Sequence, residues 1–290
     1  MIKGILILSI FLGMLNIQAK ELVRIGHMLD TSLDVSPKDM KVSLRLWITE
    51  IGKSTGLEFE PQFYNSIKEL KEDMDQGNID YIIVRALDVV EEFDINDLIE
   101  GYSPVRANNS IHNTLSLVVP KKSNYQTLRD LKDKHIGLYE GSEAEEIFIN
   151  SLLLEKELPV YTKYFSKLTY YKKRSRALLD LYFKKVDAVI VTKGTIDLAS
   201  ELNPQIGKSI QVIHQKQLHL GMVGFFSNKV DKTVVNKFYN GLINMTDNKR
   251  TQQVLTLFKS DRLEKTDKTK LLKLQQYYQD YLNLQKVTLK

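Results

Sequence analysis

The sequence has no cysteine among its 290 residues. This absence excludes disulfide bonds, thiolate metal sites, a cysteine nucleophile and a lipid anchor on an N-terminal cysteine. It also has no apolar run of the roughly 20 residues that a transmembrane helix needs. Neither sign of charge dominates, because 41 basic and 36 acidic side chains give a net charge of +5. This balance gives little support to a nucleic-acid partner. With 43% hydrophobic and 9% aromatic residues, the chain is not disordered as a whole, and its length allows two domains.

The first 19 residues have the order of a secretory signal peptide. Lys3 is followed by an apolar run over residues 4–15 and by a short polar stretch that ends at Ala19. This order of charged, apolar and small residues predicts cleavage after residue 19 and export to the periplasm. The alternative is an uncleaved segment that stays in the membrane as an anchor.

Three local patterns then occur twice, in the same order and about 100–110 residues apart. The paired segments are 22–26 with 134–138, 57–61 with 158–161, and 77–84 with 184–191. Each is short and mostly apolar, which is typical of buried parallel strands. Helical spacing of apolar residues lies between them, beginning after Ser36-Pro37 and again at residue 144. Each half therefore predicts a strand–helix–strand–helix–strand unit with a parallel sheet.

Two further apolar strands, 114–119 and 218–226, connect the halves. We therefore predict an α/β protein of two similar lobes, each a mainly parallel sheet flanked by helices, joined by a two-strand hinge beside a cleft. Lobe one is expected to comprise residues 20–118 and 222–290, and lobe two residues 119–221. The helical segment 271–284 is expected to pack on the surface of lobe one, and the alternative is a heptad that binds a partner.

These features resemble the type 2 periplasmic solute-binding proteins, in particular the phosphate, phosphite and phosphonate branch of ABC-transporter binding components. The resemblance is carried by the segment 128–137 and by Ile79-Asp80 and Val186-Asp187 at two strand starts. It implies a monomeric, non-enzymatic protein without a cofactor. Such a protein closes on a small anionic or zwitterionic, phosphonate-like solute and docks to a membrane permease.

The sequence departs from the ligand motif of this family. Members carry Asp-Pro-x-Ser-x-Ser-Gly at the first helix of lobe two, where hydroxyls and N–H groups hold an oxyanion. Here residues 139–146 read Tyr-Glu-Gly-Ser-Glu-Ala-Glu-Glu, so Ser142 is retained and Glu143 opens an acidic cluster. These glutamates either bind part of the ligand or serve as charge partners of the helix N-terminus.

A basic cluster replaces the Ser-His pair that the family often carries before the next helix. Residues 170–176 read Tyr-Tyr-Lys-Lys-Arg-Ser-Arg, with Arg174 nearest the expected position. Its guanidinium could bind a ligand oxyanion, or the cluster could be a solvated helix start. A mixed pocket is a further hypothesis, in which Glu143 binds an ammonium group and Arg174 a carboxylate.

Other candidate ligand-binding residues follow the predicted strands, because open α/β sheets bind ligands at the carboxyl ends of their strands. They are His27, Asp30 and Arg85 in lobe one and Tyr139, Thr192 and Lys193 in lobe two. His27 and Tyr139 could instead be packed residues with satisfied polar groups.

Enzyme and metal functions have little support in the sequence. The five histidines are dispersed, and there is no Gly-x-Ser-x-Gly elbow or phosphate-binding glycine loop. The leading interpretation is a binding component of an ABC uptake system. The alternatives are an exported sensory module for a membrane receptor kinase or cyclase and, with less support, a periplasmic enzyme.

Overall fold

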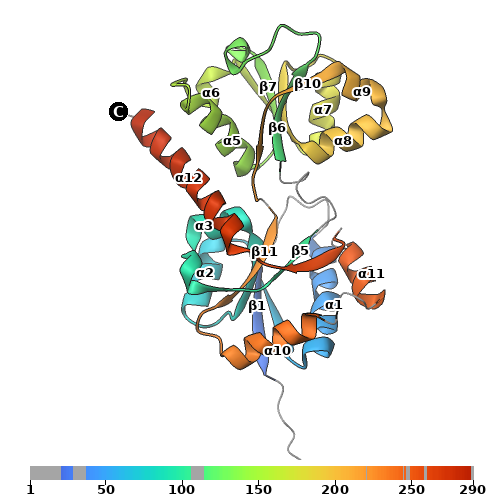
Figure 1. Cartoon of the computed structure of the whole chain (residues 1–290), viewed down its shortest axis with the longest axis vertical. Helices are drawn as coiled ribbons and strands as arrows, with labels where there is room; N and C mark the ends of the chain where they lie inside the picture. The colour runs from blue at the N-terminus through green and yellow to red at the C-terminus, as the bar shows by residue number, and fades with distance from the viewer. Residues whose placement is uncertain are drawn as a thin grey trace, which may run out of the picture.

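The computed structural model describes residues 21–28, 37–105, 114–219, 221–243, 245, 249–257 and 260–288. The predicted signal segment lies outside these ranges. Two five-stranded sheets flanked by helices form two lobes, one above the other along the long axis of the molecule (Figure 1). This arrangement confirms the predicted α/β fold of two similar lobes.

Lobe one contains a mixed sheet with the strand order β2-β1-β3-β11-β4. Strand β1 pairs in parallel with both β2 and β3, whereas β11 runs antiparallel to β3 and β4. The strands are β1 (Leu22–Met28), β2 (Glu58–Tyr64), β3 (Tyr81–Arg85), β4 (Leu98–Glu100) and β11 (Met222–Ser227). The first helices are α1 (Pro37–Thr55), α2 (Ile67–Asp75) and α3 (Ala86–Glu92), followed by the 3-10 turn η1 (Ile95–Asp97).

Lobe two repeats this plan with the strand order β10-β6-β9-β7-β8. Strand β7 is parallel to β8 and β9, and β6 is antiparallel to β9 and β10. The strands are β6 (Thr114–Pro120), β7 (His135–Tyr139), β8 (Lys167–Tyr171), β9 (Ala188–Thr192) and β10 (Ile210–Gln217). The helices are α5 (Glu143–Leu154), α6 (Tyr161–Tyr164), α7 (Arg174–Tyr182), α8 (Lys193–Leu202) and α9 (Pro204–Ser209), with the 3-10 turn η2 (Leu128–Leu131) after β6.

The duplicated aspartates perform the same structural task in both lobes. The Asp80 carboxylate accepts the backbone N–H and the Nε–H of Arg24, each at 2.9 Å. The Asp187 carboxylate accepts the backbone N–H of His135 at 2.9 Å and the Tyr125 hydroxyl at 3.0 Å. Each aspartate thus ties the start of the third strand of its repeat to the first strand. The repeated Ile-Asp and Val-Asp patterns reflect this bond.

One member of the predicted repeat was assigned to the wrong segment. Residues 158–161 do not form the second strand of lobe two, because Tyr161 begins the short helix α6 and Pro159 precedes it. The strand is β8, where aromatic and β-branched residues such as Thr169 and Tyr171 suit a pleated sheet. Its five residues pair in register with β7.

The connecting strands also differ in extent from the prediction. Strand β6 belongs to the sheet of lobe two from Thr114 onward, before the expected start of that lobe at residue 119. The strand expected at 218–226 begins only at Met222, opposite Arg85 at the end of β3. Leu218 is instead buried in the core between the lobes.

The C-terminal elements return to lobe one and then reach lobe two. Helices α10 (Lys232–Ile243) and α11 (Lys249–Leu257) pack on α1, and β12 (Arg262–Lys265) pairs with β5 (Tyr102–Val105). The last helix, α12 (Lys268–Thr288), contacts α3 of lobe one and α5 of lobe two (Figure 1). The segment 271–284 was expected on the surface of lobe one, and it packs on lobe one and also on lobe two. Its buried side chains Leu271 and Leu274 join one hydrophobic core that includes residues of both lobes.

Candidate functional site

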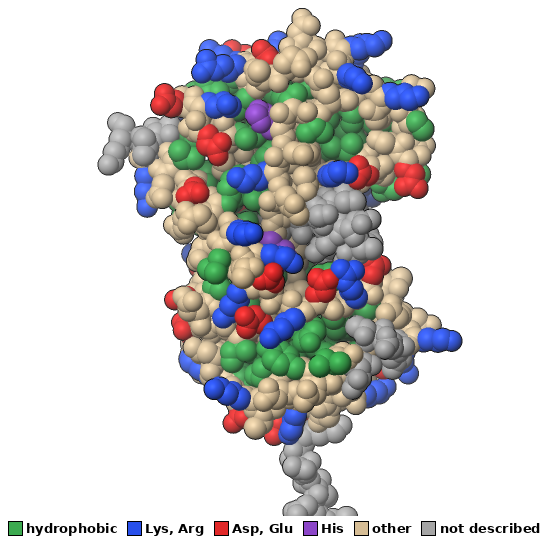
Figure 2. Space-filling model, in the orientation of Figure 1, with side chains coloured by type: hydrophobic (Ala, Val, Ile, Leu, Met, Phe, Trp, Pro, Cys, Tyr) green, Lys and Arg blue, Asp and Glu red, His purple; other side chains and the backbone are tan. Residues whose placement is uncertain are grey.

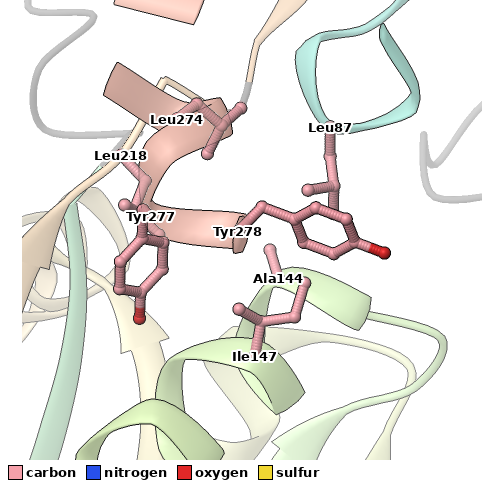
Figure 3. A pocket seen from close by; sticks show the side chains of 7 residues that line it. All are labelled: Leu87, Ala144, Ile147, Leu218, Leu274, Tyr277 and Tyr278. Atoms are coloured by element: carbon pink, nitrogen blue, oxygen red, sulfur yellow. The ribbon is translucent and has the colours of Figure 1, made fainter. Parts of the chain in front are cut away.

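Between the lobes, the first turns of α3 and α5 approach each other, since Leu87 and Ala144 line the same pocket. A small apolar pocket marks this junction (Figure 3). Its volume of about 10 Å³ is roughly the space of one water molecule. The helices α3, α5 and α12 therefore pack closely here. The lining residues are Leu87, Ala144, Ile147, Leu218, Leu274, Tyr277 and Tyr278.

Beside this junction, the acidic and basic clusters of lobe two meet in a buried ion pair. The Arg174 Nε donates to Glu145 Oε1 at 2.8 Å, and the backbone N–H of Tyr139 donates to Glu145 Oε2 at 2.7 Å. The Glu145 side chain is 0% exposed and that of Arg174 is 30% exposed. Burial raises the pKa of Glu145, and the charge of Arg174 and the N–H of Tyr139 oppose that rise.

Ser142 and Tyr139 complete this group, which we call the lobe-two cradle: Tyr139, Ser142, Glu145 and Arg174. The Ser142 hydroxyl caps α5 by accepting the backbone N–H of Glu145 at 3.4 Å, and it also accepts an Nη–H of Arg174 at 3.4 Å. The Arg174 guanidinium lies over the Tyr139 ring, 4.1 Å from its centroid. Three predicted ligand-binding residues thus lie together, at the ends of β7 and β8 and the starts of α5 and α7.

Glu145 was not among the predicted site residues, although a local signal for it exists. A serine followed three residues later by a glutamate is the spacing of a capping box. Here Ser142 caps the helix, while the Glu145 carboxylate accepts from Tyr139 instead of from the cap residue. No local pattern could have paired Glu145 with Arg174, because 29 residues separate them.

Glu143 lies outside the cradle and faces lobe one. It lies close to the carboxyl group of Glu91 in α3, whose Oε1 is buried without a hydrogen-bond partner among the described residues. Burial and the negative charges of Glu143 and Asp88 raise the pKa of Glu91 to about 8, while Arg85 opposes this rise. A proton on Glu91 therefore relieves the repulsion between carboxylates of the two lobes.

We predict that this pair makes the stability of the protein depend on pH. The folded chain holds the proton of Glu91 up to about pH 8, whereas the ordinary pKa of a glutamate side chain is 4.5. The folded state binds more protons between these values, so the free energy of unfolding falls as pH rises through this window. Between pH 5 and pH 8, the free energy of unfolding of Glu91→Gln should fall by about 1 kcal/mol less than that of the wild type, after allowance for the partial exposure of Glu91.

Urea unfolding at the two pH values measures this difference. Glu92→Gln, on the neighbouring position of α3, serves as the control and should keep the pH dependence of the wild type. Equal pH dependence in wild type and Glu91→Gln would show that the fold does not raise the pKa of Glu91.

The remaining predicted residues that the structure describes lie at strand ends, and each contacts a neighbour in its own lobe. Arg85 ends β3, and its Nε donates to the buried Asp88 carboxylate at 3.0 Å. Thr192 caps α8 by accepting the Thr195 N–H at 3.3 Å, and Lys193 pairs with Asp197 at 2.6 Å on an exposed helix start. His27 is buried, with Nδ1 2.6 Å from the Met28 carbonyl oxygen. Asp30 lies outside the described residues.

Comparison with known families decides the class of the protein. The profile of the family described as ABC transporter, phosphonate, periplasmic substrate-binding protein matches residues 31–271. The chain belongs to this family. The match extends over most of both lobes of the binding protein, including the cradle.

Solved structures show the same fold at low sequence identity. A binding component of an ABC phosphonate transporter from Pseudomonas aeruginosa is 15% identical, with 93% of this chain and 89% of that chain covered and a TM-score of 0.61. PhnD1 from Prochlorococcus marinus, in complex with methylphosphonate, is 14% identical over 91% and 99% of the chains, with a TM-score of 0.61. XAC2383 from Xanthomonas citri, bound to ATP, is 10% identical over 92% and 99%, with a TM-score of 0.66. No curated protein matches the chain by sequence.

The described part of this binding protein offers no group of three or more His, Asp and Glu side chains that could hold a metal ion. Within the same ranges, no helix combines the length and the apolar character needed to cross a membrane. On the face in Figure 2, basic and acidic side chains are interspersed over both lobes.

Proposed function

We propose that this binding protein is exported by its first 19 residues and binds a small anionic or zwitterionic, phosphonate-like solute between its lobes. It releases the solute unchanged to a membrane permease. The proposal is carried by the family match across residues 31–271. It is also supported by two arginines on opposite lobes, Arg85 at the end of β3 and Arg174 at the start of α7.

The two arginines suit an anion because a guanidinium binds planar or tetrahedral oxyanions with two parallel hydrogen bonds. Each is held in place by a carboxylate of its own lobe, Arg85 by Asp88 and Arg174 by Glu145. Their side chains are 38% and 30% exposed. A ligand held by both would connect the lobes, which is how domain closure traps a solute.

A thermal-shift screen of the chain from Lys20 onward tests this function. The panel contains phosphonates, phosphite, phosphate, sulfonates, amino acids and small carboxylates. A ligand present at about 100 times its Kd should stabilise the protein by about 2.7 kcal/mol, which is a rise in Tm of roughly 5–10 °C for a chain of this size. A panel in which no anion or zwitterion shifts the Tm would contradict the proposal.

A further inference from the structure

The lobe-two cradle already contains an anion, the carboxylate of Glu145. It takes the backbone N–H of Tyr139 and the Nε–H of Arg174, at 2.7 and 2.8 Å. Both donors converge on a side chain that is completely buried. An oxyanion of a ligand at this place would need these same donors.

We propose that Glu145 is a specificity-determining residue that selects monoanionic ligands, such as sulfonates and carboxylates, over dianions such as phosphate and fully ionised phosphonates. This inference rests on the proposed function, because it concerns the ligand of the same interlobe site. Glu145 acts on the ligand through Arg174 and through its own charge, and does not need to touch it.

The charge balance of the cradle supports this selection. Arg174 and Glu145 neutralise each other, and Glu143 and Glu146 add two acids to the same first turn of α5. The positive end of the helix dipole is thus already matched by acidic side chains. Repulsion between a carboxylate and a ligand grows in proportion to the ligand charge, so a dianion is opposed twice as strongly as a monoanion.

The hydrogen bonds of the cradle favour the ionised form of Glu145. Burial raises the pKa of this carboxyl, but both of its oxygens accept N–H donors, and one donor is the permanently charged Arg174. A carboxyl that accepts at both oxygens and faces a guanidinium is stabilised as the anion. A ligand can reach the cradle at Arg174, whose side chain is 30% exposed, and at Tyr139, whose ring lies under the guanidinium.

Calorimetric titration with methanesulfonate and methylphosphonate tests the inference, at a pH where the phosphonate is doubly ionised. The two probes have similar shapes and differ in charge. In the wild type, methanesulfonate should bind about tenfold more tightly than methylphosphonate. Glu145→Gln keeps an oxygen for the Tyr139 N–H and removes the charge, so it should improve the relative affinity for methylphosphonate by about tenfold.

Glu155→Gln is the matched control, because it removes one charge from the other end of the same helix, where Glu155 is the exposed cap. It should leave the ratio of the two affinities within about twofold. A wild type that prefers methylphosphonate, or a ratio that Glu145→Gln leaves unchanged, would overturn this inference while the proposed function stands. If neither protein binds any anion of the wider panel, the proposed function fails as well.

Discussion

Arg174→Ala is expected to lower the free energy of unfolding by about 3 kcal/mol at pH 8, because it leaves the Glu145 carboxylate buried without its cation. The carboxylate is completely buried, and among the described residues the backbone N–H of Tyr139 still donates to it. Loss of the opposing positive charge would raise the pKa of Glu145 further. The variant can therefore recover part of its stability by taking up a proton, and its deficit should be smaller at pH 5 than at pH 8.

Arg176→Ala provides the control within the same basic cluster. Arg176 pairs with Asp180 at 3.3 Å along α7, and its side chain is 60% exposed. The Asp180 carboxylate is 14% exposed, and it keeps Lys185 Nζ at 3.5 Å when Arg176 is removed. Because helix pairs at this spacing contribute about 0.3–0.5 kcal/mol, the variant should unfold almost as the wild type does. Urea denaturation followed by circular dichroism at both pH values compares the proteins. Equal stability of the two variants would show that Arg174 does not compensate a buried charge.

Leu274→Ala is expected to cost about 3 kcal/mol, because it removes a buried side chain from the core that joins the lobes. Leu274 is 3% exposed and lines the interlobe pocket with Leu87 of lobe one and Ile147 of lobe two. The cavity would open where α12 packs between α3 of lobe one and α5 of lobe two. The neighbouring side chains are closely packed there and have little freedom to fill it.

The same helix supplies a matched control for this prediction. Leu272 is 50% exposed, and Leu272→Ala should change the free energy of unfolding by less than about 0.5 kcal/mol. A second readout is limited proteolysis between the lobes, which should become faster in Leu274→Ala only. If both leucine variants behave alike, α12 does not stabilise the junction.

The duplicated fold could be predicted from the sequence because its signals are local. Short apolar runs, turn residues and the repeated Asp80 and Asp187 each mark an element within a few residues. The prediction failed at residues 158–161, where a proline and a short helix interrupt an apolar stretch that resembles a strand. Nothing in that stretch shows that the later segment 167–171, and not this one, will pair with β7 in the sheet.

The candidate site was only partly predictable, because its decisive contacts join distant segments. Ser142 and Arg174 could be selected by comparison with the ligand motifs of the family, and Tyr139 from its place at a strand end. The sequence showed acidic and basic clusters without showing that Glu145 and Arg174 neutralise each other. The packing of α12 could not be predicted either, since an apolar helix face does not show whether it will pack on one lobe or on both.

The measurement that tests the central claim most directly is a calorimetric titration of the wild type, Arg85→Lys and Arg174→Lys with the anion that stabilises the protein most. Lysine keeps the charge but loses the paired hydrogen bonds of the guanidinium. We predict one ligand bound per chain of the wild type, and affinity reduced at least about tenfold in each variant, because the ligand contacts both lobes. Unchanged affinity in both variants would contradict an interlobe anion site.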